Sequence, residues 1–173
     1  MAVFPIREFG DPVLRTPAGH VEDIDDAIRK LMTDMTETML AAPGVGLAAP
    51  QIGISKRVIV WNYEEDRGAL ANPRIVDSSG AETDDEACLS LPGLLYPVQR
   101  AEWVKIEGVD ADGEEVSREG SGWVARIFQH EVDHTEGVLF IERLPEELKR
   151  EAKRQLMDQV MGGGNPVRRK TTL

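Results

Sequence analysis

Apolar side chains recur every three or four residues from Asp25 to about Ala42, and this spacing predicts a long amphipathic helix. Asp23 or Asp25 can cap its first turn. The stripe that we expect to face the core consists of Ile28, Leu31, Met32, Met35 and Met39. Methionines in such a stripe are typical of core packing, so we expect a structural role for this helix.

Shorter runs rich in β-branched residues predict strands separated by polar turns. The expected strands are Arg57–Asn62, Ala69–Asn72, Arg74–Asp77, Glu102–Val109 and Glu114–Glu119. The last two flank Asp110-Ala111-Asp112-Gly113, a composition typical of a hairpin turn. These two strands are therefore expected to pair with each other.

A second helical pattern begins near Ser121, which can cap a helix start, and stops near Gly137. Four side chains fall at spacings of four, three and four residues, which is one face of one helix: Trp123, Ile127, His130 and His134. Val124, Phe128 and Val132 widen the apolar surface. Both histidines therefore extend a stripe that we expect to be buried, where an unpaired polar ring is costly.

The two ends of the chain carry weaker patterns. Residues 1–24 contain three prolines, which break helices, so we expect an irregular arm there. Pro145 opens a last helix, whose packing side is predicted to hold Leu148, Ala152, Leu156 and Val160. We expect a single domain over residues 1–164, followed by a basic, disordered tail over residues 165–173.

Length and charge narrow the possible functions. The chain has 173 residues, which suits one domain with its own core. Twenty basic and 31 acidic residues give a formal charge of −11, which argues against bulk binding of DNA or anionic membranes. No apolar run approaches a membrane span, and the first residues lack a secretory or transit pattern, so we expect a cytoplasmic protein. A single cysteine excludes an intramolecular disulfide.

The stretch with the clearest chemistry is Gln129-His130-Glu131-Val132-Asp133-His134. In a helix, His130 and His134 project from one face, one turn apart, and can hold one divalent ion. Glu131 lies beside them, where its carboxylate can take a proton from water activated by the ion. The sequence therefore predicts a metal site on this helix.

Catalytic metal sites usually have three protein ligands and one open position, so a third ligand is needed. One metalloprotease pattern has a third histidine six residues after the second, but Phe140 occupies that position. Glu147 or Glu151 would match another pattern, although both lie at what reads as an exposed helix end. Cys88 would complete a Cys-His-His set that binds zinc or ferrous iron. The residues alone leave the glutamates and Cys88 open.

A bare segment of glycine, proline and small apolar residues runs from Pro43 to Gly53. Its backbone can come close to a ligand, or it can form a buried loop. It lacks the Lys-Ser/Thr ending of a phosphate loop. Gln51 is its one side chain that can both donate and accept hydrogen bonds.

Three segments together resemble the motifs of one family, the bacterial peptide deformylases, and in particular the branch shared with organelles. They are Gly44-Val45-Gly46-Leu47-Ala48-Ala49-Pro50-Gln51, Glu86-Ala87-Cys88-Leu89-Ser90 and the histidine stretch Gln129–His134. Their order and approximate separation match the family, and further similarity covers nearly all of the chain except the tail. The resemblance implies an α+β fold. Small antiparallel sheets would pack around a central metal-binding helix, with a long N-terminal helix and a C-terminal helix.

The resemblance also implies a reaction and a set of roles. The family removes the formyl group from the N-terminal methionine of new polypeptides and releases formate. The metal ligands by position would be Cys88, His130 and His134, with water as the fourth. Glu131 would be general base and then acid, while Gln51 and the backbone N–H of Leu89 would bind the oxyanion. Ferrous iron is the expected metal, with Zn²⁺, Ni²⁺ or Co²⁺ as substitutes.

By the same resemblance, the substrate-binding residues would be Val45, Gly46, Glu86, Ala87, Arg100, Trp123 and Ile127. One of them departs from the family, which normally has glycine at the position of Ala87. The alanine would be strained if that position required a positive φ, at a cost of about 1 kcal/mol or more. We nevertheless expect an active enzyme.

Other functions compete with this interpretation. A metallopeptidase with a glutamate as third ligand would share the helix motif, and a deformylase relative could act only as a binding module. Basic residues also gather on the last helix and the tail: Lys149, Arg150, Lys153, Arg154, Arg168, Arg169 and Lys170. They are either a solvated surface or, by resemblance, a site of transient contact with ribosomal RNA. Formylated nascent peptides are the expected partners, and neither DNA nor membrane is expected.

Overall fold

The computed structural model describes residues 2–162, which form an α+β fold. The helices are α1 (Asp26–Ala41), α2 (Gly122–Thr135) and α3 (Glu146–Gly162), with short 3₁₀ helices η1 (Pro12–Arg15), η2 (Ala49–Ile52) and η3 (Phe140–Arg143). The strands are β1 (Gly46–Ala48), β2 (Val58–Tyr63), β3 (Asp66–Ser79), β4 (Glu82–Cys88), β5 (Leu91–Arg100), β6 (Trp103–Val109) and β7 (Glu115–Ser121). The α+β class expected from the family resemblance is confirmed.

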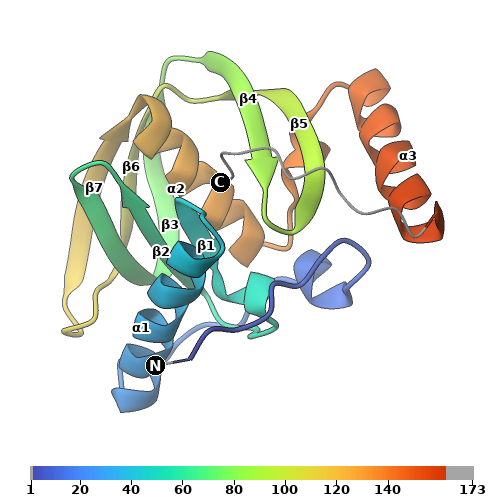
Figure 1. The fold of residues 1–173 in the computed structure, drawn as a ribbon. Helices are drawn as coiled ribbons and strands as arrows, with labels where there is room; N and C mark the ends of the chain where they lie inside the picture. Colours follow the sequence, from blue (N-terminus) through green and yellow to red (C-terminus); the bar gives the residue numbers. More distant parts are fainter. Residues whose placement is uncertain (1, 163–173) are drawn as a thin grey trace.

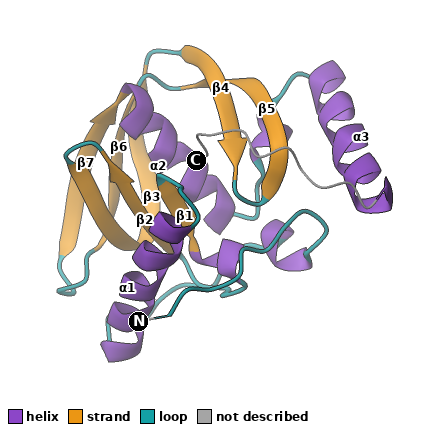
Figure 2. Cartoon of the chain, in the orientation of Figure 1, coloured by secondary structure: helices purple, strands orange, loops and turns teal. Residues whose placement is uncertain are grey.

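The strands of the described residues form two separate antiparallel sheets (Figure 2). Five strands pair in the order β1-β2-β3-β6-β7, and β4 pairs with β5. Leu89 and Ser90 join β4 to β5, and Cys88 pairs with Leu91 across this turn. Cys88 therefore lies at the closed end of the β4–β5 hairpin, the name used below for Glu82–Arg100.

Helix α2 runs between the five-stranded sheet and the β4–β5 hairpin (Figure 1). Its apolar side chains pack on those of the sheet, and together they form a buried group that we call the sheet cluster. The members are Ala48, Ile59, Trp61, Leu70, Val104, Ile106, Ala125, Ile127, Phe128 and Val132. Within it the Phe128 ring meets Trp61 edge-on, with centroids 5.0 Å apart. Helix α1 packs against β1 and β2 in another cluster, where Met35 and Met39 are fully buried. Packing on the sheet thus fixes the position of α2.

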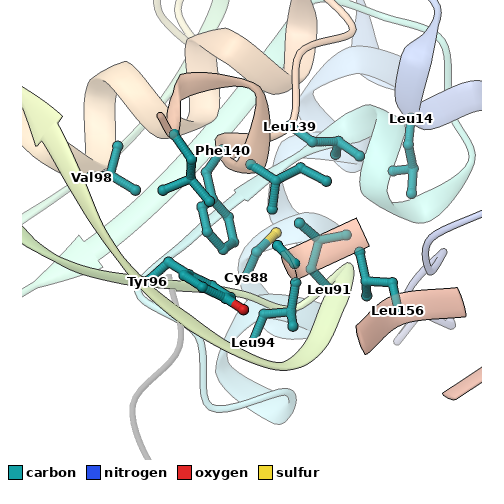
Figure 3. Packing of buried hydrophobic residues seen from close by; sticks show 12 residues of the cluster. Leu14, Cys88, Leu91, Leu94, Tyr96, Val98, Leu139, Phe140 and Leu156 are labelled. Atoms are coloured by element: carbon teal, nitrogen blue, oxygen red, sulfur yellow. The ribbon is translucent and has the colours of Figure 1, made fainter. Parts of the chain in front are cut away.

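A third apolar cluster belongs to the β4–β5 hairpin (Figure 3). The hairpin cluster consists of Leu14, Cys88, Leu91, Leu94, Tyr96, Val98, Leu139, Phe140, Ile141, Leu144, Ala152 and Leu156. It joins the hairpin to η1, η3 and α3, and none of its members belongs to α2. The hairpin and α2 therefore have different apolar partners.

Most elements expected from the sequence are present. Helix α1 lies within one residue of the predicted range at each end, and the Asp25 carboxylate accepts a hydrogen bond from Ile28 N–H. The β6–β7 hairpin and β2 are also confirmed. Ser121 precedes α2 as predicted, although its side chain makes no capping bond, and Gly137 follows the helix in the left-handed region.

Two expectations about secondary structure were wrong, and one pair of strands was not predicted. The two strands predicted around Pro73 are one strand, β3, because a register shift and the left-handed Asn72 (φ 50°) carry the chain past the proline without leaving the sheet. The acidic run that begins at Glu82 is itself a strand, β4, and its partner β5 was not expected. Val160, predicted to pack, is 65% exposed.

The two ends of the chain fit the predictions only in part. Residues 2–24 are irregular apart from η1, as expected from their prolines. The predicted tail over residues 165–173 lies outside the described part of the chain. Between residues 2 and 162 no helix is both long enough and apolar enough to span a membrane.

Candidate metal centre

Three side chains from two parts of the fold converge on one point. Helix α2 presents His130 and His134 from one face, and Cys88 comes from the end of β4. The His134 Nε2 atom lies 3.2 Å from His130 Nε2 and 3.3 Å from Cys88 Sγ. All three residues are buried. Of the third ligands that the sequence left open, the structure brings Cys88 to the histidines.

The spacing of these atoms fits a tetrahedral ion. Metal–nitrogen bonds of about 2.0–2.1 Å place two nitrogen ligands about 3.3 Å apart, close to the observed separation of the histidine nitrogens. The donor set of one thiol and two imidazoles suits Zn²⁺ or Fe²⁺. Burial alone would lower the pKa of His130, but hydrogen bonds with Cys88 and Glu86 raise that pKa well above its usual value. Cys88 and Glu86 thus favour a positive charge at His130, which a bound cation would supply in place of a proton.

Glu131 is fully buried, and neither of its carboxylate oxygens has a hydrogen-bond partner within residues 2–162. Burial raises the pKa of Glu131 to about 7. The backbone of Gly46 lies against this carboxylate: a Cβ added there would be 2.3 Å from Glu131 Oε1. The absence of a side chain at Gly46 therefore makes room for the Glu131 carboxylate, whose oxygens have no hydrogen-bond partner in the described chain. A carboxyl group with a pKa near neutrality can both accept and donate a proton.

Two N–H donors lie next to Cys88. The Gln51 Oε1 atom accepts a hydrogen bond from Ala48 N–H at 2.8 Å, which fixes the orientation of the amide. Its Nε2 then lies 3.6 Å from Cys88 Sγ and 3.3 Å from Ser90 Oγ. The Leu89 N–H donates to no acceptor in the described part of the chain. Donors fixed in this way can stabilise a developing oxyanion.

Glu86 and Arg100, expected among the substrate-binding residues, are buried in an ion-pair network. Arg100 donates to both Glu86 oxygens, and His130 Nδ1 lies 2.9 Å from Glu86 Oε2. Burial alone would raise the pKa of Glu86, but hydrogen bonds from His130 and Arg100 hold it well below its usual range. An ionised Glu86 accepts a hydrogen bond from His130 Nδ1–H and leaves the Nε2 lone pair of His130 for a metal.

The network extends to residues that sequence reasoning missed. Asp133 Oδ2 accepts from Arg100 Nη1 at 2.7 Å and from Arg143 Nε at 3.1 Å. Arg126, also on α2, donates to Glu86 Oε1 at 2.8 Å. A sequence signal was available for two of them: Arg126 and Asp133 are charged residues within a helix predicted to be buried, and buried charges need partners.

Ala87 is free of the strain considered above. The described non-glycine residues with positive φ are Pro43, Glu64 and Asn72, so Ala87 has an ordinary backbone conformation. It is half-buried and lies where the β4–β5 register shifts between Glu86 and Cys88. An alanine is therefore compatible with this backbone.

The remaining predicted cleft residues lie on one side of α2. Val45 and Trp123 are half-buried and pack against the sheet cluster, and Ile127 is fully buried within it. The Trp123 ring stacks on Tyr63, with centroids 6.3 Å apart and an angle of 22° between the planes. Tyr63, at the end of β2, had no role in the sequence-based interpretation.

The other candidate ligands lie apart from the three converging side chains. Glu147 is exposed on α3, and Glu151 accepts a hydrogen bond from the Tyr96 hydroxyl at 3.1 Å. His20 is exposed near Asn72. Among the described residues, the histidine, cysteine and acidic side chains that gather tightly enough for one ion are Cys88, His130 and His134.

Comparison with known proteins gives a consistent result. The family model described as polypeptide deformylase matches residues 3–150. A peptide deformylase of Acidothermus cellulolyticus is 51% identical over 99% of this chain and 95% of its own length. A protein named peptide deformylase 2 from Corynebacterium efficiens is 45% identical over 90% of this chain and 87% of its own.

Solved structures agree with the sequence comparisons. The peptide deformylase of Thermus thermophilus superimposes with a TM-score of 0.86 at 46% identity, covering 93% of this chain and 99% of that one. That of Ehrlichia chaffeensis, in complex with actinonin, gives a TM-score of 0.87 at 35% identity, with coverages of 92% and 98%.

Proposed function

The chain belongs to the peptide deformylase family, and from this premise we propose how its own residues carry out the reaction. The protein is a hydrolase that removes the N-formyl group from nascent polypeptides. The family is metal-dependent, and Cys88, His130 and His134 form a group that can hold an ion. One observation supports the proposed roles most directly: the buried carboxylate of Glu131 has no protein partner within residues 2–162 and lies on the helix turn that carries both histidines.

The proposed cofactor is one divalent cation held by Cys88, His130 and His134. Family resemblance favours Fe²⁺ in the cell, with Zn²⁺, Ni²⁺ or Co²⁺ as substitutes. A cation held there would supply Lewis-acid chemistry, activating water and polarising the formyl carbonyl. Glu86 orients His130 through a hydrogen bond to its Nδ1, and Arg100 holds Glu86 in place as its ion-pair partner.

The protons and the developing charge are handled by side chains and backbone of this chain. Glu131 accepts a proton from the attacking water and then passes it to the leaving amine. Gln51 Nε2 and the Leu89 N–H donate hydrogen bonds to the oxyanion that forms on the formyl oxygen. Because Gln51 and Glu131 are fully buried, these interactions act where little water competes.

The substrate methionine and the peptide backbone are proposed to lie against Val45, Gly46, Ala87, Trp123 and Ile127. Gly46 also has a second role: it leaves space for the Glu131 carboxylate, which any side chain at this position would displace. The formyl group is small, which suits a site whose walls at Gly46 are bare backbone.

The test is formate release from a formyl-Met peptide by protein prepared without oxygen and loaded with iron or nickel. We expect Glu131→Gln to lose about 10²–10⁴-fold in kcat while it keeps its metal, because the proton acceptor is gone. Glu136→Gln is the matched control, since Glu136 follows α2 but pairs with Arg57 at the surface. Equal activity of both variants would refute the role of Glu131.

We further propose a single catalytic domain over residues 1–164, a cytoplasmic location and transient contact with the ribosome. Two lysines on α3 are less available than the sequence suggested, because Lys149 and Lys153 bond to Glu142 at 3.4 and 3.1 Å. Arg150 and Arg154 are exposed. Charge reversal at both arginines should reduce co-sedimentation with ribosomes, and an unchanged level, also after deletion of residues 163–173, would exclude the contact.

A further inference from the structure

The three candidate ligands come from two parts of the fold that have separate apolar cores. His130 and His134 belong to α2, which packs in the sheet cluster, whereas Cys88 belongs to the hairpin cluster. The β4–β5 hairpin pairs with no strand of the larger sheet in the described chain. Within residues 2–162, no backbone hydrogen bond joins the hairpin to α2. The Phe140 ring of the hairpin cluster stacks on His130, with centroids 6.1 Å apart, and the other links between the two parts are made by polar side chains.

Arg126 bridges these two parts of the fold. It is buried on α2, one helix turn before His130. Its Nη1 donates to Val98 O on β5 at 2.8 Å and to Asp84 O on β4 at 3.4 Å, and its Nη2 donates to Glu82 O at 3.1 Å. Nη1 also donates to Glu86 Oε1. One guanidinium thus holds main-chain carbonyls of both hairpin strands and the carboxylate that orients His130.

Apart from the contact between Cys88 and His134, two other polar links connect the hairpin to α2 within residues 2–162, and they differ in kind from those of Arg126. Arg100 bonds to Asp133, and Glu86 bonds to His130, so both run from side chain to side chain. Arg126 is the α2 side chain that donates to the backbone of the described hairpin. Its planar fork spans both strands, which the single ammonium of a lysine cannot do.

We propose that Arg126 is a positioning residue for the metal centre: it sets the distance between Cys88 on the hairpin and the histidines on α2. The proposal rests on the metal site described under the proposed function. The hydrogen bonds of Arg126 within the described chain go to the hairpin backbone and Glu86, and none goes to Cys88, His130 or His134. The arginine holds the three donors at metal-binding distance, so that little of the binding free energy is lost in bringing them together.

The test measures Co²⁺ binding to the full-length chain, prepared with a reduced thiol and without oxygen. The variant Arg126→Met keeps an apolar stem of similar length and removes every hydrogen bond of the guanidinium. We expect Co²⁺ to bind about 10–100-fold more weakly and the thiolate-to-cobalt charge-transfer band to weaken. Hydrogen exchange at the amides of β4 should accelerate more than exchange in β6. Arg126→Lys retains the charge, and its Co²⁺ affinity should lie between that of Arg126→Met and that of the unmodified protein.

Val104→Ala is the matched control. Val104 is fully buried in the sheet cluster on β6, so its truncation destabilises the fold without touching the link between hairpin and α2. The control should bind Co²⁺ within about twofold of the unmodified chain, and its charge-transfer band should be unchanged.

Either of two results would overturn the proposal. One is Co²⁺ affinity within about twofold of the unmodified chain for folded Arg126→Met, with an unchanged charge-transfer band. The other applies if Arg126→Met does not fold. In that case, an Arg126→Lys variant that binds Co²⁺ as tightly as the unmodified chain would show that the guanidinium is not needed. Failure of the unmodified chain to bind Co²⁺ would instead refute the metal centre itself, and formate release by that chain would still test the reaction separately.

Discussion

Helix α2 carries two sets of buried polar groups that differ in how they are satisfied. In the first set, the two Glu131 oxygens and His134 Nδ1 are buried without partners in the described chain. In the second set, Asp133 and Arg126 are equally buried, but each makes several hydrogen bonds to charged side chains or main-chain carbonyls. Unpartnered buried groups are costly, so a fold tolerates them where a metal, water or substrate completes them. The difference separates groups that act on a substrate from groups that hold the helix and hairpin in place.

The largest effect should follow from removing the ligand that the hairpin supplies. Cys88→Ala leaves two histidines on one helix turn, which is too few for a stable catalytic site. We expect loss of bound metal and no measurable formate release, while the protein stays folded, because Cys88 is a small member of the hairpin cluster. Elemental analysis after dialysis and a thermal melt check this. Full metal retention would favour a peptidase-like site with a glutamate ligand.

A large effect of a different kind should follow from removing a buried charge whose hydrogen bonds are satisfied. Asp133→Ala leaves Arg100 buried beside one carboxylate instead of two and releases Arg143. Breaking a buried pair in this way should lower the free energy of unfolding by about 3–5 kcal/mol, as measured by urea denaturation. Asp112→Ala, in an exposed turn, is the control and should change it by less than about 0.5 kcal/mol. A large loss in kcat without a loss in the free energy of unfolding would contradict the division between these two sets of groups.

The oxyanion donor should matter for turnover and little for folding. Gln51→Ala removes an N–H donor and is expected to reduce kcat about 10²–10³-fold, which corresponds to roughly 3–4 kcal/mol of transition-state stabilisation. Metal content should stay the same, since Gln51 Nε2 lies 3.6 Å from Cys88 Sγ and is no ligand. A rise in KM with unchanged kcat would show that the amide binds ground state and transition state alike.

The smallest effect is expected at Ala87. Because its backbone is not left-handed, Ala87→Gly relieves no strain, and the added chain flexibility should cost about 0.5–1 kcal/mol of stability. Activity with a formyl-Met peptide should change by less than about threefold, and metal content should be unchanged. A large gain in kcat would mean that the methyl group crowds the substrate.

Elements defined by local periodicity could be predicted, and elements defined by partners could not. Helix α1 follows from its apolar spacing and the Asp25 cap, and the β6–β7 hairpin follows from its turn. Strand β5 was missed because Pro92, Gly93 and Pro97 break any strand pattern when read alone. The hairpin tolerates them because, in the described chain, β4 is the one strand paired with β5. Val160 fits the helical stripe of α3, but the hairpin cluster ends at Leu156.

The candidate site divides in the same way. The sequence by itself determined that His130, Glu131 and His134 share a helix turn, because a spacing of four residues is a property of the helix. Only the tertiary structure brought Cys88, 46 positions from His134, to the same point, and gave Arg126, Asp133 and Glu86 their partners. The reason is physical: a helix sets its own periodicity, whereas contact between a hairpin and a helix depends on packing and ion pairs between distant segments.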